Sequence, residues 1–235
     1  MAALQPSEAQ IGGFTAAEGP FLIDSAEDLN LRSESLGRDW VSDFVGSLQV
    51  LSAANPAANG LVLASGQSPL GSLHASIPRD KYGSIQGGFG IPMPAQPGAS
   101  TLVAPGDITS FESLRFFACY APSTLPNLKF QVLLECYPQN PDGTHPTIFW
   151  NYTPPAGVGF GAVSVLLNNN AGILNNPASR TASELMTKTR FLYFLNFASP
   201  VDPGANLDVW VDDLQLLGPE SPTTAATSGK WYLYR

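Results

Sequence analysis

The sequence predicts an all-β fold: a two-sheet antiparallel β-sandwich, or jelly roll, with one short connector helix. Short runs in which apolar and polar residues alternate recur along the chain, and turn-forming residues separate them. The chain holds 22 Gly and 21 Pro, and only 13% of its 235 residues are charged. A chain of this length suits one β-sandwich domain that buries a sizeable core without disulfides or metals.

The strands are predicted from a two-residue period, because successive side chains of a strand point to opposite faces of a sheet. Gly, Pro, Asn and Asp lie between nearly all of the runs. The expected strands are 47–53, 60–64, 70–77, 84–91, 100–103, 114–120, 128–137, 147–152, 162–167, 190–197 and 207–217. A short helix is predicted over 183–188, with Thr181 or Ser183 as its cap and Glu184 in its first turn.

Two flanks are expected to border the sandwich domain, which covers residues 20–218. Residues 1–19 form a polar N-terminal arm, and residues 219–235 form a linker with an aromatic C-terminal tail. We expect this tail either to return as an edge strand of its own domain or to dock on a neighbouring chain by strand addition. The predicted assembly residues are Trp231, Tyr232, Leu233 and Tyr234.

Charge and hydropathy restrict the partners. The net charge of −8 repels phosphate backbones and no basic stripe offsets it, so no nucleic-acid partner is expected. The first residues show no signal-peptide pattern, and the longest nearly apolar run, 158–167, is too short to cross a bilayer. We therefore expect no membrane insertion, and a location that is extracellular or within a virion.

The two cysteines lie in successive predicted strands but in opposite phase. Cys119 points away from the core, whereas Cys136 is in phase with the inward-facing Phe130, Val132 and Leu134. Side chains on opposite faces cannot form a disulfide. Two free thiols are expected.

Catalytic residues are not expected. His74 lies on a predicted strand surface and His145 follows a turn, and neither belongs to a metal-binding motif. The nearest match to a serine-nucleophile elbow lacks the final glycine and carries a proline. Glu112, Glu135 and Asp142 show no spacing that aims two carboxyl groups from one strand face, as a glycosidase needs. We therefore predict a protein that is not an enzyme.

Four short segments resemble the galactose-binding-like jelly rolls of many carbohydrate-binding modules. The segment 207–218, with Asp212-Asp213-Leu214 at its centre, is similar to their last strand. The other three segments are 21–28, 71–76 and 113–118. The resemblance suggests a fold more than a function.

The resemblance implies a structural Ca²⁺ that joins the first and last strands. Asp24 or Glu27 and Asp212 or Asp213 would supply carboxylate oxygens. One carboxylate of the Asp pair points toward the sandwich, where it needs a cation or hydrogen-bond donors. The alternative is that an Asp accepts backbone N–H groups or caps a turn.

The resemblance also implies a glycan partner, since such modules stack sugar rings on exposed aromatic side chains. The candidates are Trp150 and Tyr152 on one face of the predicted strand 147–152, with Tyr120 and Tyr137. Each of these rings could instead pack in the core or on a strand surface.

Three functions follow from these features. The first is a non-catalytic structural or adhesive subunit of a larger extracellular or phage-like virion assembly, with other protein subunits as partners. The alternative is a carbohydrate-binding module that recognises glycans. The second alternative is a polysaccharide lyase or hydrolase on the same scaffold.

Overall fold

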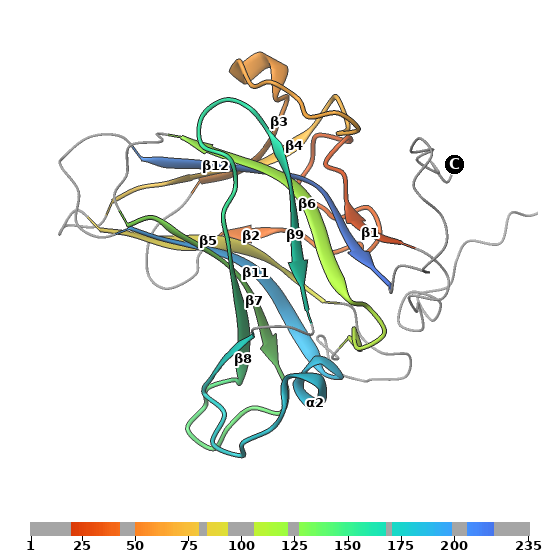
Figure 1. Ribbon diagram of the computed structural model, residues 1–235, viewed down its shortest axis with the longest axis vertical. Coiled ribbons are helices and arrows are strands. Elements are labelled where there is room, and N and C mark those ends of the chain that lie inside the picture. Colours follow the sequence, from red (N-terminus) through yellow and green to blue (C-terminus); the bar gives the residue numbers. More distant parts are fainter. Residues whose placement is uncertain are drawn as a thin grey trace, which may run out of the picture.

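Two β-sheets stacked face to face make up the described part of the chain, as predicted (Figure 1). The computed structural model describes residues 20–42, 50–79, 84–93, 106–121, 127–167, 171–198 and 206–218. Among these residues no helix is long and apolar enough to span a membrane.

The first sheet is built around the strand that ends the described chain. Its order is β3 (Val50–Ala54), β4 (Ser72–Ile77), β12 (Leu207–Leu217), β6 (Ser113–Ala121) and β9 (Gly161–Leu166), and β1 (Phe21–Asp24) also pairs with β12. All of these neighbours are antiparallel.

Counted over the described residues, the second sheet also contains six strands. Its order is β10 (Gly172–Leu174), β8 (Thr147–Tyr152), β7 (Lys129–Cys136), β11 (Thr189–Ala198), β5 (Ile85–Pro92) and β2 (Val41–Ser42), again antiparallel throughout. Neighbouring strands are often far apart in sequence, as expected of a jelly-roll-like sandwich.

Most predicted strands are confirmed to within a few residues, and 147–152 and 207–217 match β8 and β12 at both ends. The predicted strand 60–64 is wrong, because this segment makes only an isolated bridge, between Val62 and Gly159. The predicted strand 100–103 lies outside the described residues. The sequence prediction missed the short edge strands β2 and β10, which contain too few residues for a period to show.

The predicted connector helix is α2 (Ala182–Met186), and a one-turn 3-10 helix, η2 (Ala57–Asn59), precedes β4. Thr181 is the N-cap of α2, and its hydroxyl and the Glu184 carboxylate form a capping box. Leu185 and Met186 are buried, so the helix closes one end of the core.

The core lies between the inner faces of the two sheets and is rich in aromatic rings. Phe194 of β11 and Phe116 of β6 meet edge to face across the sandwich, with ring centroids 5.1 Å apart. Phe89 of β5 stacks on Phe194 at 5.2 Å. These three phenylalanines are 0% exposed, so burial of alternate side chains from both sheets provides the main stabilisation.

Two loops of the chain cover part of the outer face of the first sheet. Leu61 and Phe160, from two loop segments, pack on Phe117, Cys119 and Trp210 and form a second, smaller apolar cluster. Backbone hydrogen bonds between the two loops hold this cover in place. The loops therefore cover the aromatic part of this outer face, whereas the outward-facing residues of β9 stay exposed.

The opposite orientation of the cysteines is confirmed. Cys136 belongs to the core between the sheets, whereas Cys119 belongs to the cluster on the outer face, and both are free. Burial raises the pKa of each thiol to about 12, so neither is a reactive thiolate at neutral pH.

A β-bulge in β12 explains how Trp210 can lie outside while Leu214 and Leu216 lie in the core. The register with β6 shifts between Asp212 and Gln215, and Asp213 adopts a positive φ of 48°. The extra residue reverses the phase of alternation along the strand. Even-numbered residues therefore face outward before the bulge, as Trp210 does, and inward after it, as Leu214 and Leu216 do.

Candidate functional site

The outer face of the second sheet carries a row of aromatic side chains. We call these five residues the aromatic face: Tyr137, Phe149, Phe191, Tyr193 and Phe197. All except Tyr193 are half-buried, so part of each of those four rings contacts solvent. Leu133 and Leu195 fill the spaces between the rings and are buried.

The register of the strands sets the spacing of the rings. Phe191, Tyr193 and Phe197 alternate with core residues along β11, and Phe191 stacks on Tyr193 with centroids 5.1 Å apart. Phe191 and Phe197 are six residues apart on one strand, which at about 3.4 Å per residue is a span of roughly 20 Å. The row is therefore long enough for an extended chain rather than one small molecule.

Two glycines, each on a strand beside one that carries a ring, let Tyr193 and Phe149 lie close to the sheet. A Cβ atom on Gly90 of β5 would lie 2.2 Å from Cδ1 of Tyr193. On the other side, a Cβ on Gly172 of β10 would lie 2.2 Å from Cζ of Phe149. Because neither strand has a side chain at these points, the rings lie across the strands and widen the apolar surface.

Amide side chains lie beside the rings. Gln131 of β7 and Asn151 of β8 are register partners, and Nε2 of Gln131 donates to Oδ1 of Asn151 at 3.0 Å. Asn151 is exposed, so its amide nitrogen faces solvent with donor capacity left over. Apolar rings with a few fixed polar groups are the usual composition of a small-molecule site.

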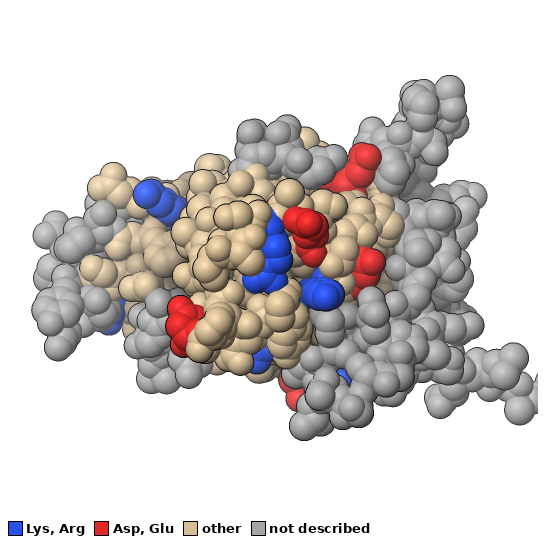
Figure 2. Space-filling view, turned by 90° about the horizontal axis from the view of Figure 1, so that it is seen from below, with Lys and Arg blue, Asp and Glu red and all other residues tan. Residues whose placement is uncertain are grey.

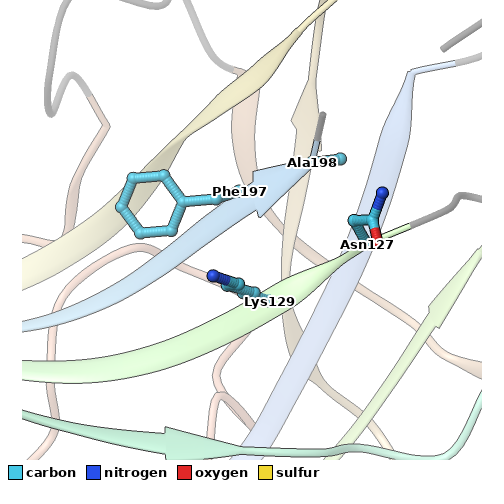
Figure 3. A pocket seen from close by; sticks show the side chains of 4 residues that line it. All are labelled: Asn127, Lys129, Phe197 and Ala198. Carbon is cyan, nitrogen blue, oxygen red and sulfur yellow. The ribbon is translucent and has the colours of Figure 1, made fainter. Parts of the chain in front are cut away.

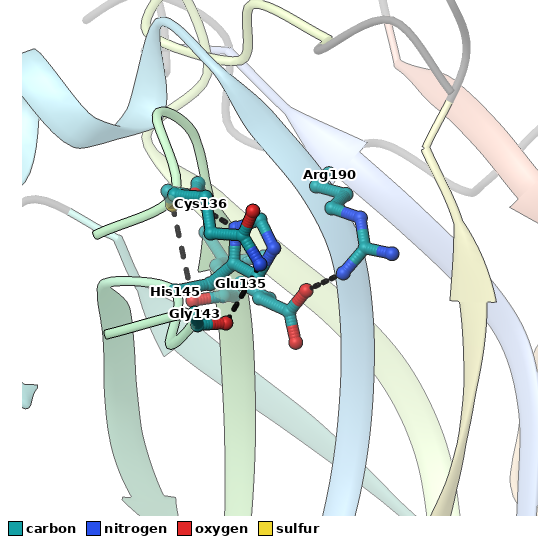
Figure 4. Close-up of polar contacts among 7 residues, drawn as sticks. Glu135, Cys136, Gly143, His145 and Arg190 are labelled. Carbon is teal, nitrogen blue, oxygen red and sulfur yellow. Dashed lines mark hydrogen bonds and ion pairs between the residues drawn. The ribbon is translucent and has the colours of Figure 1, made fainter. Parts of the chain in front are cut away.

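A charged pair ends the row. Glu135 of β7 accepts a hydrogen bond from the Arg190 guanidinium (Figure 4). The guanidinium carbon lies 5.2 Å from the centroid of the Phe191 ring and 5.8 Å from that of the Tyr137 ring. Partial burial by itself lowers the pKa of Arg190, but the Glu135 charge outweighs it and the pKa is raised. The guanidinium therefore stays charged between the two rings.

Tyr137 is held by contacts within the same end of the sheet. Its ring meets the ring of His145 edge to face at 5.3 Å, and Nδ1 of His145 lies 3.2 Å from the Cys136 carbonyl oxygen. Figure 4 shows His145 and Cys136 next to the Glu135–Arg190 pair. His145 thus has a positioning contact and is not part of a metal cluster in the described chain.

The structure corrects two of the four predicted sugar-stacking residues. Trp150 and Tyr152 are 4% and 8% exposed and belong to the core, so neither can present a ring to a glycan. Tyr120 is half-buried, and its ring packs on Phe130 at 4.8 Å, away from the aromatic face. Tyr137 is the one candidate that the structure places on that face.

A signal for this correction is present in β8 itself. Polar Thr147 and Asn151 alternate with Ile148, Trp150 and Tyr152, so the two-residue period assigns the latter three to the core face. The functional candidates that the sequence analysis missed are Phe149, Phe191, Tyr193 and Phe197. In β11 both faces are apolar, so alternation alone could not separate outer rings from core rings.

The predicted calcium ligands do not come together as one group. Asp24 accepts hydrogen bonds from the Trp40 indole N–H and the Ala26 N–H, at one edge of the core. The other carboxylates whose charges raise its pKa are Glu34 and Asp28. Although the backbone of Asp24 pairs with Leu214, its carboxylate shares no hydrogen-bond donor with Asp212 or Asp213.

The other three predicted ligands bind one loop, residues 64–71: Asp212 and Asp213 fasten it to β12, and Glu27 fastens it to the segment that follows β1. Asp213 accepts from Ser68 N–H and O–H at 2.7 and 2.6 Å, and Asp212 accepts from Gln67 Nε2 at 2.7 Å. Glu27 accepts from the backbone N–H groups of residues 70 and 71 at 2.8 and 3.1 Å. This is the alternative in which Asp accepts protein N–H groups.

This arrangement does not fit a metal ion. Within the described ranges, no three His, Cys, Asp or Glu side chains lie close enough to hold one. The carboxylates of Glu27, Asp212 and Asp213 already accept hydrogen bonds from protein donors, which satisfy part of their need for a positive partner. Calcium binding by Asp24, Glu27, Asp212 and Asp213 therefore stays a prediction from the resemblance.

A melting experiment tests the calcium prediction. We expect Tm to be the same in EDTA and in millimolar Ca²⁺, because the carboxylates are already hydrogen-bonded. A cation held only by the folded state would raise Tm as its concentration rises. Such a rise, absent from an Asp212→Asn, Asp213→Asn double variant, would establish the predicted site and contradict our expectation.

The two predicted flanks lie outside the described residues. They are the arm 1–19 and the tail 219–235 with the predicted assembly residues Trp231, Tyr232, Leu233 and Tyr234. Their proposed role in assembly stays a prediction.

Comparison with known proteins supports the fold. No protein-family model and no curated protein matches the sequence. A solved structure similar to this chain is the family 11 carbohydrate-binding module of the cellulosomal cellulase Lic26A-Cel5E of Clostridium thermocellum, with a TM-score of 0.51 and 13% identity over 86% of this chain and 95% of that one.

The family 11 module from Clostridium thermocellum in complex with a beta-1,3-1,4-mixed-linked tetrasaccharide is similar to the same degree, with a TM-score of 0.51 and 13% identity over 85% of this chain and 96% of that one. The identity is low, so the likeness concerns the fold alone. The chain has a β-sandwich fold like that of carbohydrate-binding modules.

Proposed function

We propose that this protein is a non-catalytic carbohydrate-binding module that binds an extended glycan on its aromatic face. The observation that carries the proposal is the row of half-buried rings on the outer face of the second sheet. The apolar faces of sugar rings pack on such flat aromatic surfaces, and the polar edges need hydrogen-bond partners nearby.

The choice between the two outer faces follows from what covers them. On the first sheet, Leu61 and Phe160 cover the outward-facing aromatic residues Phe117 and Trp210, which are buried. On the second sheet, Phe149, Phe191 and Phe197 keep part of their rings exposed. Exposed aromatic surface of this kind usually marks an interaction site.

The polar groups favour binding over bond cleavage. Glycoside hydrolysis needs two carboxyl groups across one site. Within the strands of the second sheet Glu135 is the only acidic residue, and Arg190 holds its carboxylate. The aromatic face therefore offers hydrogen bonding and stacking but no pair of acid and base.

The structural neighbour suggests a first ligand to test. The family 11 module with a similar fold is in complex with a beta-1,3-1,4-mixed-linked tetrasaccharide. We propose that an unbranched glucan of this type, or another extended polysaccharide, lies along the roughly 20 Å between Phe191 and Phe197. A protein that binds such a polysaccharide would act outside the cell, where the polysaccharide is found.

Binding of mixed-linked glucan tests the function directly. We expect the wild-type protein to be retarded in gels that contain the polysaccharide, and Phe149→Ala and Phe191→Ala each to weaken binding about tenfold, because loss of a stacked ring removes about 1–3 kcal/mol. Isothermal titration with oligosaccharides would give the affinities.

Phe21→Ala is the matched control, because Phe21 is also half-buried but lies on β1 of the first sheet. It should bind as the wild-type protein does. Circular dichroism must show that all variants keep the sheet content. If no glycan in a broad array binds, or if Phe21→Ala and Phe191→Ala bind equally, the proposed function is wrong.

A further inference from the structure

The two sheets differ in charge. In the first sheet the acidic and basic strand residues are Asp24, Arg115, Asp208, Asp212 and Asp213, so acidic groups dominate. In the second sheet they are Lys129, Glu135 and Arg190. A chain with a net charge of −8 thus keeps a net positive charge on the sheet that carries the aromatic face.

Lys129 is the charge that remains unneutralised on this sheet. Glu135 and Arg190 form an ion pair with each other at the opposite end. Lys129 is exposed, and no carboxylate of the described residues forms an ion pair with it. Its ammonium group has three donors available for a ligand.

A pocket lies where Lys129 meets the last ring of the row. It has a volume of about 340 Å³, and the described residues that line it are Asn127, Lys129, Phe197 and Ala198 (Figure 3). Lys129 and Phe197 are register partners on β7 and β11, so their side chains leave the same face of the sheet side by side. The pocket therefore combines a flat ring with a cation.

Two amides flank this pair. Asn127 precedes β7 in a turn with a positive φ of 54°, which Asn tolerates better than most residues, and its side chain lines the pocket. Gln86 of β5 is the register partner of Phe197 on the other side. A row of amine, ring and amide across three strands can both stack on a sugar and donate hydrogen bonds to its substituents.

We infer that this pocket binds an anionic substituent, a carboxylate or a sulfate ester, on a sugar whose ring stacks on Phe197. The inference rests on the proposed function and adds the substrate class, an acidic polysaccharide. Lys129 would donate to the anionic oxygens, and Asn127 would donate to a neighbouring oxygen.

A single cation beside a ring differs from a basic patch. Figure 2, viewed from the side on which β8 and α2 lie in Figure 1, shows acidic and basic side chains interspersed among uncharged surface. Such a surface does not attract polyanions in general, and the net charge of −8 repels them. Recognition would therefore depend on one oriented contact.

The test compares matched ligands on the full-length protein by isothermal titration. One pair is an oligogalacturonate and the same oligosaccharide with its carboxyl groups reduced to alcohols. The second pair is a sulfated galactan oligosaccharide and the same oligosaccharide after desulfation. We expect one of the two anionic ligands to bind at least tenfold more tightly than its neutral counterpart.

The variants separate the roles of charge and ring. Lys129→Met should weaken binding of the anionic ligand about tenfold and leave a neutral ligand within twofold, whereas Lys129→Arg should keep most of the affinity. Phe197→Ala should weaken both ligand types. Lys188→Met is the matched control, because Lys188 is exposed and precedes β11 at its other end.

The outcomes distinguish the inference from the function on which it rests. Preference for the uronate or for the sulfate, lost in Lys129→Met but kept in Lys188→Met, supports the inference and identifies the anion. Equal binding of the oligogalacturonate and its reduced form, with no preference for the sulfate, overturns the inference alone. Equal losses in the two lysine variants also overturn it. Failure of every ligand, neutral or anionic, overturns the proposed function.

Discussion

Replacing Phe194 by Ala is expected to lower the free energy of unfolding by about 3–5 kcal/mol. Phe194 is 0% exposed and lies at the centre of the core. Its ring contacts Phe89, Phe116, Trp40 and Tyr152, with centroid distances of 5.2, 5.1, 6.4 and 6.4 Å. Truncation removes contacts to both sheets and leaves a cavity that the hydrogen-bonded strands cannot move together to close.

Urea unfolding followed by tryptophan fluorescence measures this loss, provided that the transition is two-state. Phe197→Ala is the control on the same strand, because Phe197 is half-buried on the outer face. It should cost only about 1 kcal/mol. Similar losses for the two variants would show that Phe194 does not join the sheets as the structure indicates.

The second large effect is a fall in stability as the pH rises from about 4 to 8. Burial raises the pKa of Asp212 to about 8, with the Asp213 charge adding to it and the Gln67 hydrogen bond opposing it. Burial likewise raises the pKa of Asp24 to about 6, against the hydrogen bonds from Trp40 and Ala26. In the unfolded chain both groups have pKa values near 3.8.

Stability falls with rising pH because the folded state binds more protons than the unfolded state. Between these values the folded state holds protons that the unfolded state has released, so the unfolded state gains stability as the pH rises. The stability that protonated Asp24 and Asp212 contribute is fully present below about pH 4. It is lost by about pH 6 for Asp24 and by about pH 8 for Asp212.

Asp212→Asn should remove much of this dependence, because an amide is neutral at every pH. We expect the variant to match the wild-type protein at pH 4 and to exceed it at pH 8 by on the order of 2 kcal/mol. Asp39→Asn, at an exposed site paired with Arg32, is the control and should leave the pH profile unchanged. A wild-type stability that rises between pH 5 and 8 would contradict the assignment of Asp212 as a buried neutral acid.

Local sequence predicted the strands well where one face is polar. In β7, Lys129, Gln131 and Glu135 alternate with Phe130 and its inward neighbours, and the observed strand follows that pattern. The helix was predicted from Thr181 and Glu184, whose capping box depends only on neighbours within one turn. Such features depend on interactions between residues close in sequence, so the local sequence is enough to predict them.

The sequence predicted the kind of candidate site, a glycan-binding surface of aromatic rings, but not most of its residues. The resemblance suggested the fold of a glycan-binding module. Trp150 and Tyr152 lie in the core, however, and of the four predicted stacking residues only Tyr137 lies on the aromatic face. The two-residue period gives relative phase along a strand but not which phase is inside when both are apolar. In β11, with Phe191 and Phe194 on opposite faces, that choice is made by the packing of the other sheet.

The sequence by itself determined an all-β sandwich, the capped connector helix and the opposite faces of Cys119 and Cys136, because each follows from local periodicity or a single turn. Only the tertiary structure decided that loops cover one sheet while rings line the outside of the other. It alone placed Lys129 beside Phe197, since those side chains meet through strand pairing across 68 residues of chain, which no local pattern encodes.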